Sequence, residues 1–513
     1  MIIRRLSIAI LAVALLVSGC AGKNVRPQYN IKSIKPTITT AANSQSFWRD
    51  KVVYPFPVKY TKAKDEKGIE WEIAYMDDYF GTGKKSDAET VVLIHGRGAN
   101  SGYWGNIHKA LLARGKRVVA IDIPHYGKSI PGNLDKPLTR SLDDVRAVIY
   151  EVVVKQLKIN KAVYLGHSLG GQTVLGYSVK YPEAVSKIIL EAPGGLEEFN
   201  DVPLIHTSLR DDFAKWKKAW AVTGRLQAER ARTPASVKAD YYFKGAGNNP
   251  GYFYKDGEIP QYLTSVRQRM ISASPKEYSN YTAMYIREIF SVADELRKSD
   301  KNNLVKRFNE IKAPVFLAMG AKDPFFPVST LSGNSDVKLD LIKPFHDTLT
   351  DSGNIPQIKI YDNVGHFIHT DVADLFASDV LDFIDGNSID DLEDPAAYSE
   401  KTDDSVAMPP EIKQFFDGFE KALQSKDRKQ IASFYSEDFQ GGRGNKKQMV
   451  DFVCGNISFI SKYQVTLKSL KIEKDIAIVS GSANYGAGVS EIQEGSGLRK
   501  ENGRWVWYGE VKR

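Results

Sequence analysis

The sequence pattern with the clearest chemical potential is GHSLGG at residues 166–171. An apolar run precedes it at 162–165 and a helical pattern follows at 172–180, so Ser168 is expected on a sharp turn between a strand and a helix. The flanking glycines let neighbouring backbones approach closely. The start of a helix also favours an anion that develops beside it. This arrangement is typical of a nucleophilic serine.

A nucleophilic serine needs a base, and two later residues fit that need. The apolar run 314–320 ends just before Asp323, and the run 358–361 is followed by His366. An imidazole could take the proton of the serine, and a carboxylate could hold the imidazole in the right orientation. Taken alone, Asp323 could be a turn former and His366 a solvated loop residue. Their joint placement after two strands favours a catalytic set with Ser168.

A reacting serine also needs donors for the oxyanion that forms on its substrate. The segment 91–98, VVLIHGRG, predicts a strand that ends in a tight glycine turn. The backbone N–H of Arg97 in this turn and that of Leu169 after the serine are the expected oxyanion-hole donors. The side chain of His95 is interpreted as a structural group that holds the loop.

At these residues the chain resembles the α/β-hydrolase superfamily, over about residues 85–385. A further matching stretch is DIPHYGKS at 122–129, which is similar to the D-x-P-G-x-G-x-S loop of that family. His125 stands where glycine is usual, a difference that would alter the rim of the pocket and leave the catalytic set unchanged.

The resemblance implies a role for each residue of the set: Ser168 as nucleophile, His366 as base and Asp323 as acid. His369 lies three residues beyond the proposed base, and Glu197 follows another apolar run. We interpret these last two as supporting or structural groups.

The elements that must position these residues are predicted by short apolar runs that alternate with amphipathic stretches from 51 to 385. Such a pattern indicates an α/β fold with a mostly parallel sheet covered by helices on both faces. The runs lie at 90–95, 117–123, 161–165, 187–192, 313–320 and 357–361.

A long insertion at about 196–310 separates two of the predicted strands, and the resemblance implies a helical cap there. The insertion is basic and rich in aromatic residues. It could admit an acyl substrate with an anionic or aromatic group, or rest on anionic lipid headgroups. The simpler interpretation is that the aromatic residues form the core of the cap and the charges its solvated face.

Beyond the sheet, residues 386–410 are acidic and rich in Ser, Pro and Asp, which indicates a linker. Residues 411–513 contain two helical patterns, at 412–423 and 428–435, and then three or four strands. Residues 436–439 are expected to close the second helix. Residues 411–513 resemble the nuclear transport factor 2-like (steroid-isomerase-like) fold, which implies a small cone-shaped α+β domain. We interpret it as a non-catalytic binding or dimerisation module, so a dimer through this domain is possible.

The N-terminal residues are predicted to be a targeting signal. Two arginines precede an apolar run that is short for a membrane span, and VSGC follows at 17–20. The segment looks like the lipobox of bacterial lipoproteins, which implies a signal peptide at 1–19, an acylated Cys20 and a tether at 20–50. Ala21 favours the outer membrane of a Gram-negative cell over its inner membrane. An ordinary secretory signal is the alternative.

Composition excludes several other classes. The chain has 513 residues, 42% hydrophobic and 26% charged, with a net charge of +8, so it is globular and no nucleic-acid binder is indicated. Cys20 and Cys454 are its only cysteines, which excludes a disulfide framework and a cysteine metal site. No phosphate-binding loop or metal-ligand cluster is visible, so we expect neither a cofactor nor a metal.

Two functions of different classes fit these patterns. The first is a lipid-anchored serine hydrolase that cleaves an ester, thioester or amide through an acyl-enzyme on Ser168, and a C–C bond hydrolase remains open because the same residues can serve it. The second is a non-enzymatic surface lipoprotein that uses the hydrolase scaffold for binding.

Overall fold

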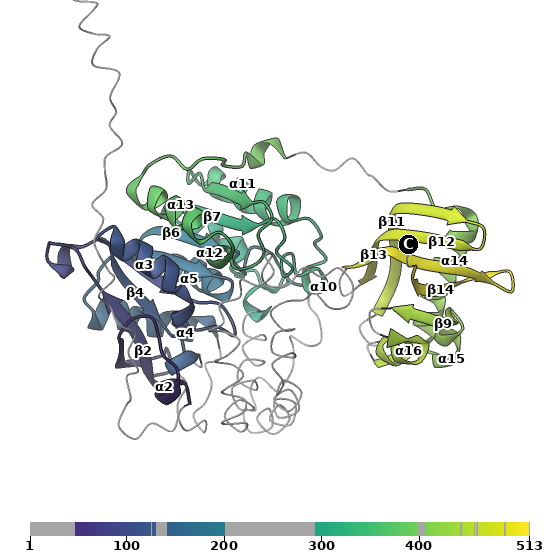
Figure 1. Ribbon diagram of the computed structural model, residues 1–513, viewed down its shortest axis with the longest axis horizontal. Coiled ribbons are helices and arrows are strands. Elements are labelled where there is room, and N and C mark those ends of the chain that lie inside the picture. Colours follow the sequence, from purple (N-terminus) through teal and green to yellow (C-terminus); the bar gives the residue numbers. More distant parts are fainter. Residues whose placement is uncertain are drawn as a thin grey trace, which may run out of the picture.

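The computed structural model describes residues 47–124, 126–129, 141–200, 293–398, 406–441, 444–455, 457, 460–486 and 489–511. The predicted signal peptide, Cys20, His125 and most of the predicted cap lie outside these residues. The described chain forms two sheets with separate hydrophobic cores, one before residue 390 and one after residue 411 (Figure 1).

The first sheet has eight strands in the order β1-β2-β4-β3-β5-β6-β7-β8. Its strands are β1 (Val58–Lys64), β2 (Glu70–Asp78), β3 (Thr90–Ile94), β4 (Arg117–Ile121), β5 (Ala162–His167), β6 (Val185–Glu191), β7 (Val315–Gly320) and β8 (Gln357–Tyr361). The pairs β1/β2 and β2/β4 are antiparallel, and all other pairs are parallel. The predicted fold class and its six apolar strands are confirmed.

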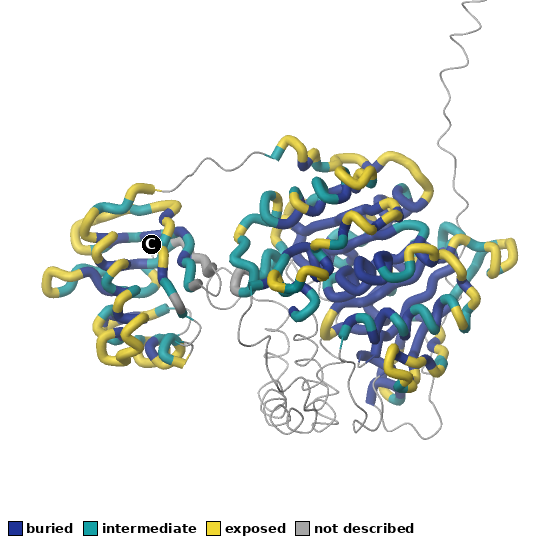
Figure 2. The backbone as a smooth tube through the Cα atoms, turned by 180° about the vertical axis from the view of Figure 1, so that it is seen from behind, coloured by how far each residue is buried: buried dark blue, intermediate teal, exposed yellow. Residues whose placement is uncertain are grey.

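The sequence analysis missed β1 and β2, at one edge of the sheet. In β1, Val58 and Ala63 are buried while lysines between them face solvent, so no continuous apolar run marks the strand. By contrast, every residue of β3, β4, β5 and β7 is buried, as the dark blue strands of Figure 2 show. Strands buried on both faces need helices on both sides.

Helices flank this sheet in two groups: α3 packs with α13, and α4 packs with α5. The helices of this part are α2 (Phe47–Lys51), α3 (Gly105–Ala113), α4 (Leu142–Tyr150), α5 (Leu169–Lys180), α10 (Ser329–Ser332), α11 (Lys343–Asp351), α12 (Ile368–Asp371) and α13 (Ala373–Asp385). Local sequence fixes their ends. Ser141 and Asp144 form a capping box on α4, and Gly386 ends α13 in the left-handed conformation.

The two ends of the long insertion meet beside the sheet. The amide of Phe199 donates to the carbonyl of Leu296 at 2.7 Å, and the amide of Lys298 donates to the carbonyl of Phe199 at 2.8 Å. The described stems of the predicted cap are therefore paired, while residues 201–292 lie outside the described part of the chain.

The second sheet has the order β10-β9-β14-β13-β12-β11, and its one parallel pair is β14/β9. Its elements are α14 (Pro410–Ser425), α15 (Arg428–Ala432), β9 (Tyr435–Gly441), β10 (Gly444–Asn445), α16 (Lys446–Gly455), β11 (Ile460–Glu473), β12 (Ile476–Gly486), β13 (Val489–Glu501) and β14 (Arg504–Glu510). Helix α14 buries Ile412, Phe415, Phe416 and Phe419 at helical spacing. The sequence analysis expected residues 436–439 to end a helix, but they lie in β9 because Tyr435 and Phe439 pack into this core.

The first domain begins before residue 51, although the tether was predicted to extend to residue 50. Phe47 and Trp48 of α2 are buried in the core of the first sheet. Lys128 holds this helix: its Nζ donates to the carbonyl of Trp48 at 2.7 Å and to that of Val52 at 2.5 Å, and the residue is fully buried. Within the described ranges, no helix is both long and apolar enough to cross a membrane.

Replacing Lys128 tests this anchor. Burial lowers the pKa of Lys128 from 10.5 to about 8, so between these values the unfolded chain binds a proton that the folded chain does not. The variant Lys128→Met should unfold about 1–3 kcal/mol more easily at neutral pH, since buried carbonyls lose their donor. The wild type should then gain further stability over the variant as pH rises from about 8 toward 10.5, because its unfavourable buried charge is lost.

Denaturation by urea at several pH values measures this difference. Lys109→Met is the matched control, because Lys109 is exposed on α3 and its loss should leave stability nearly unchanged at every pH. A wild-type advantage that stays constant or shrinks as pH rises through this window contradicts the prediction.

Candidate functional site

Ser168 stands between β5 and α5 with φ 56° and ψ −119°, a backbone conformation that is unfavourable for a residue with a side chain. Hydrogen bonds hold it there. Its amide donates to the carbonyl of Glu191 at 3.0 Å, and its carbonyl accepts from the amides of Gly171 and Gly194, each at 2.9 Å. The predicted turn between strand and helix is therefore present, and Ser168 is half-buried at its tip.

Two glycines of the motif allow this turn to form. A side chain at Gly166 would overlap the carbonyl of Gly170, and a side chain at Gly170 would overlap the carbonyl of Ile94 at the end of β3. The turn thus lies against its own helix and against the neighbouring strand. This close approach is the physical reason for the glycine spacing.

His366 and Asp323 meet as predicted from the ends of two adjacent strands, β8 and β7. Asp323 Oδ2 lies 2.7 Å from His366 Nδ1, and the two side chains are 1% and 5% exposed. Asp323 Oδ1 accepts from the amide of Phe325 at 2.8 Å. Because a carboxylate only accepts, Nδ1 of His366 carries a proton, and in the neutral ring Nε2 then has the lone pair. This is the form that a general base requires.

The same edge of the sheet brings Ser168 and His366 together. The ring of His167, which directly precedes Ser168, lies 4.7 Å from the ring of His366. His167 Nε2 lies 2.8 Å from the carbonyl oxygen of His366. The turn after β3 closes the third side, since a Cβ on Gly96 would lie 3.0 Å from the Cβ of Ser168. The three predicted loops therefore converge on one place.

The two predicted oxyanion donors are the neighbours of residues at the Ser168 turn. Leu169 is the first residue of α5, where an amide has no partner within its helix. Arg97 is exposed in the turn after β3, next to Gly96. Leu169 directly follows Ser168, and Arg97 directly follows Gly96, whose backbone approaches the serine. The oxyanion hole itself stays a prediction.

The other polar residues singled out from the sequence support the site. His95 is fully buried; its Nε2 accepts from the amide of Ile123 at 3.2 Å and its Nδ1 donates to the carbonyl of Gly96 at 2.8 Å. Glu197 accepts from the amide of Val328 at 2.6 Å, in the segment that follows Asp323, and burial raises the pKa of this carboxyl. Both side chains hold neighbouring backbone, which agrees with their structural interpretation.

His369 is also structural, and its partner was missed. Its Nδ1 lies 2.7 Å from Oε1 of Glu191, which also accepts from the amide of His369 at 2.8 Å. Both residues are at most 1% exposed. A carboxylate as the last residue of an apolar strand was the available signal for Glu191. Tyr103 and His167 were missed as well, because nothing in local spacing marks a buried polar contact.

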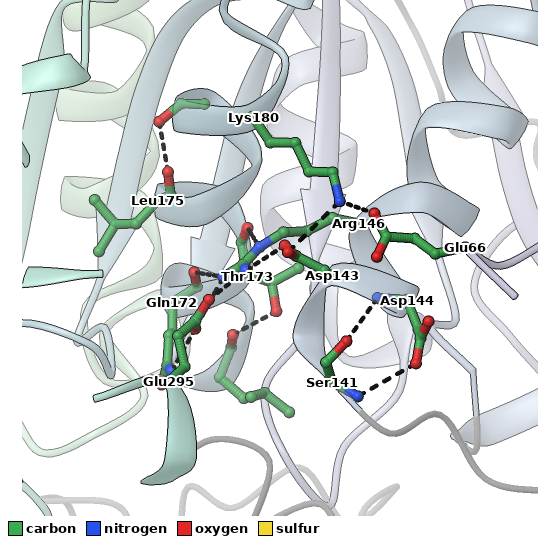
Figure 3. Close-up of polar contacts among 12 residues, drawn as sticks. Glu66, Ser141, Asp143, Asp144, Arg146, Gln172, Thr173, Leu175, Lys180 and Glu295 are labelled. Atoms are coloured by element: carbon green, nitrogen blue, oxygen red, sulfur yellow. Dashed lines mark hydrogen bonds and ion pairs between the residues drawn. The ribbon is translucent and has the colours of Figure 1, made fainter. Parts of the chain in front are cut away.

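Arg146 of α4 bonds the first turns of helix α5, which follows Ser168 (Figure 3). Its guanidinium donates to the carbonyls of Gln172 and Thr173 at 3.0 and 3.1 Å and pairs with Glu295, with one contact at 3.1 Å. Gln172 Nε2 also donates to Glu295 at 2.9 Å. Because Glu295 lies on the returning stem of the insertion, this cluster joins that stem to α5.

The described residues contain no group of three or more His, Cys, Asp or Glu side chains that could hold a metal ion. Two imidazole–carboxylate pairs, His366 with Asp323 and His369 with Glu191, lie at the end of the sheet that carries Ser168, and such groups suit acid–base chemistry by side chains.

Comparison with known proteins identifies the family of this chain. Residues 89–369 match the family described as alpha/beta hydrolase fold, and the chain belongs to that family. It is 25% identical over 301 residues to 2-hydroxy-6-oxo-6-phenylhexa-2,4-dienoate hydrolase of Comamonas testosteroni, covering 58% of this chain and 88% of the relative. It is 25% identical over 332 residues to 2-hydroxy-6-oxononadienedioate/2-hydroxy-6-oxononatrienedioate hydrolase 1 of Pseudomonas putida, covering 64% and 96%.

Among solved structures, the chain is similar to an esterase from Exiguobacterium antarcticum. The TM-score is 0.42 at 20% identity, over 64% of this chain and all of that one (100%). With the family match and the hydrolases among its relatives, the chain is an enzyme of the hydrolase class.

The variant Glu295→Gln tests whether the Arg146 cluster stabilises the fold at α5. Arg146 is 2% exposed, so neutralising its partner leaves a buried charge with weaker compensation. We expect a loss of about 1–3 kcal/mol in the free energy of unfolding. Urea denaturation is the measurement.

A second arginine–glutamate pair in the same domain is the matched control. Arg307 and Glu310 are 42% and 46% exposed, so Glu310→Gln should change stability by at most about 0.5 kcal/mol. Equal effects of the two substitutions would show that the Arg146 cluster does not brace the fold.

Proposed function

We propose that this hydrolase cleaves a carboxylic ester, or a thioester or amide, through an acyl-enzyme on Ser168. His366 Nε2 takes the proton of Ser168 as Oγ attacks the carbonyl carbon, and the amides of Arg97 and Leu169 bind the oxyanion. The intermediate then collapses, and His366 gives the proton to the leaving group. Water, deprotonated by the same imidazole, releases the acid and restores the serine.

One observation carries the proposal: the buried hydrogen bond between Asp323 and His366 lies beside the turn that holds Ser168. The carboxylate fixes the tautomer that leaves Nε2 available, and it stabilises the imidazolium that forms when the serine loses its proton. A buried imidazole–carboxylate pair can also be structural, as that of His369 with Glu191 is. What favours a reaction over binding is the place of the Asp323–His366 pair beside the turn of Ser168.

A second candidate reaction is hydrolysis of a C–C bond, and the named relatives favour it. The compound in the name of the first relative has a carboxylate, a ketone and a hydroxyl group but no ester or amide. Its hydrolysis must therefore break a carbon–carbon bond. The same serine could attack the ketone, and the carbon leaving group would take the proton.

The proposal includes a lipid anchor on Cys20, in the outer membrane of a Gram-negative cell, with the acyl substrate recognised by the basic, aromatic insertion. Support comes from the sequence of residues 1–20 and from the composition of the insertion. The proposed role of the C-terminal α+β domain is binding or dimerisation, on the strength of its resemblance to the nuclear transport factor 2-like fold.

Labelling by an alkyl fluorophosphonate tests the nucleophile. We expect covalent labelling of the full chain on Ser168, no labelling of Ser168→Ala, and at least about a hundredfold slower labelling of His366→Ala, because the base is lost. Peptide mass spectrometry identifies the modified residue. Ser178→Ala is a matched control, since Ser178 lies on the same helix but bonds only the carbonyl of Leu175 in the described structure, so it should label like the wild type.

A correctly folded wild type that remains unlabelled, or a label on another residue, contradicts the proposal. A panel of p-nitrophenyl acyl esters beside 2-hydroxy-6-oxo-6-phenylhexa-2,4-dienoate then separates the two reactions. Turnover of the dienoate without turnover of any ester would favour the C–C bond hydrolase.

The lipid anchor has its own test. In a Gram-negative host, the full chain should incorporate labelled palmitate and the variant Cys20→Ala should not, because only Cys20 follows the lipobox. Cys454→Ala, which removes the one other cysteine, should retain the label. Incorporation that survives Cys20→Ala would rule out this anchor.

A further inference from the structure

A buried chain of hydrogen bonds runs beneath the proposed nucleophile and uses residues that the mechanism above does not. The amide of Gly96 lies 2.9 Å from the hydroxyl of Tyr103, and that hydroxyl lies 3.0 Å from His167 Nδ1. His167 Nε2 lies 2.8 Å from the carbonyl oxygen of His366. Tyr103 is 8% exposed and His167 is 1% exposed.

Every proton in this chain has a definite position. The carbonyl of His366 can only accept, so His167 carries its proton on Nε2 and leaves Nδ1 as an acceptor. Burial, together with the neighbouring imidazoles, lowers the pKa of His167 well below its ordinary value, which keeps the ring neutral. Tyr103 therefore donates to His167 and accepts from the amide of Gly96. Each donor has one acceptor, so the donors and acceptors of these hydrogen bonds cannot be exchanged.

Packing fixes Tyr103, which links Gly96 to His167. The ring of Tyr103 meets the ring of His369 edge-on at 4.7 Å, and His369 is held by the buried carboxylate of Glu191. The ring of Phe367 lies 6.0 Å from the ring of Tyr103. The hydroxyl of Tyr103 therefore has little freedom to leave its two partners.

These hydrogen bonds join the three loops on which the proposed reaction depends. Gly96 precedes Arg97 in the turn that borders the serine, His167 precedes Ser168, and His366 is bonded through its own main chain. A shift of about 1 Å in any of these loops would change the approach of the base to the nucleophile and could lower the rate a hundredfold.

We propose that Tyr103 and His167 are positioning residues for the hydrolytic reaction: their hydrogen bonds set the backbone of His366 and the turn of Gly96 relative to Ser168. This inference rests on the proposed function, because it assigns the two residues to the reaction of Ser168. It adds residues that touch neither the substrate nor the reacting atoms.

The variant Tyr103→Phe tests the proposal, since it removes one hydroxyl and keeps the ring. Its matched control is Tyr177→Phe, because Tyr177 is also buried and its hydroxyl accepts a hydrogen bond from that of Tyr164 at 3.0 Å, outside the hydrogen-bond chain. Both variants lose a buried hydrogen bond, so both should melt at a somewhat lower temperature than the wild type. Only Tyr103→Phe should react with an alkyl fluorophosphonate about tenfold or more slowly.

Steady-state hydrolysis of a p-nitrophenyl ester, per active site titrated with the fluorophosphonate, separates positioning from loss of folded protein. For Tyr103→Phe, kcat should fall while KM stays within about twofold, since ground-state binding is unchanged. His167→Gln can still donate near the former Nε2, whereas the shorter side chain of His167→Asn cannot reach the carbonyl of His366. The glutamine variant should therefore react faster than the asparagine variant.

The outcomes distinguish the two claims. If the wild type is labelled but Tyr103→Phe and Tyr177→Phe react at the same rate per folded protein, the positioning role is wrong and the proposed function stands. If the folded wild type is not labelled on Ser168, both are overturned.

Discussion

A carboxylate from the loop after β7 holds an imidazole from the loop after β8, with 2.7 Å between Asp323 Oδ2 and His366 Nδ1. Both side chains are buried, so the pair forms in a medium where a hydrogen bond to a charged group is strong and an unpaired partner would be unfavourable. The ends of the parallel neighbours β7 and β8 determine the position of this pair. The rest of the site is arranged around it.

The strands achieve this because their carboxyl ends share one edge of the sheet. β5, β6, β7 and β8 are consecutive neighbours, so Ser168, Glu191, Asp323 and His366 leave the same side of the fold. Glycines then remove the steric barriers. Gly166 and Gly170 let the serine turn lie against β3, at the expense of a strained φ at Ser168 that surrounding hydrogen bonds maintain.

Sequence reasoning found what depends on local pattern. Runs of buried residues marked six strands, and the positions after three of them marked Ser168, Asp323 and His366. It missed β1, where exposed lysines stand between two buried residues. It also extended a helix to Tyr435 and closed it with residues 436–439, although Tyr435 and Phe439 pack in β9. The hydrogen bonds of Tyr103 with His167 join residues that are 64 positions apart, so only the fold could reveal them.

The position of one proton tests the central claim most directly. In protein labelled with ¹⁵N-histidine, NMR should show the neutral ring of His366 protonated on Nδ1, with a strongly deshielded proton signal that disappears in Asp323→Ala. That result would place the free lone pair on Nε2, the nitrogen that takes the proton of Ser168 in the proposed reaction. A ring protonated on Nε2 instead, unchanged by removal of Asp323, would contradict the account.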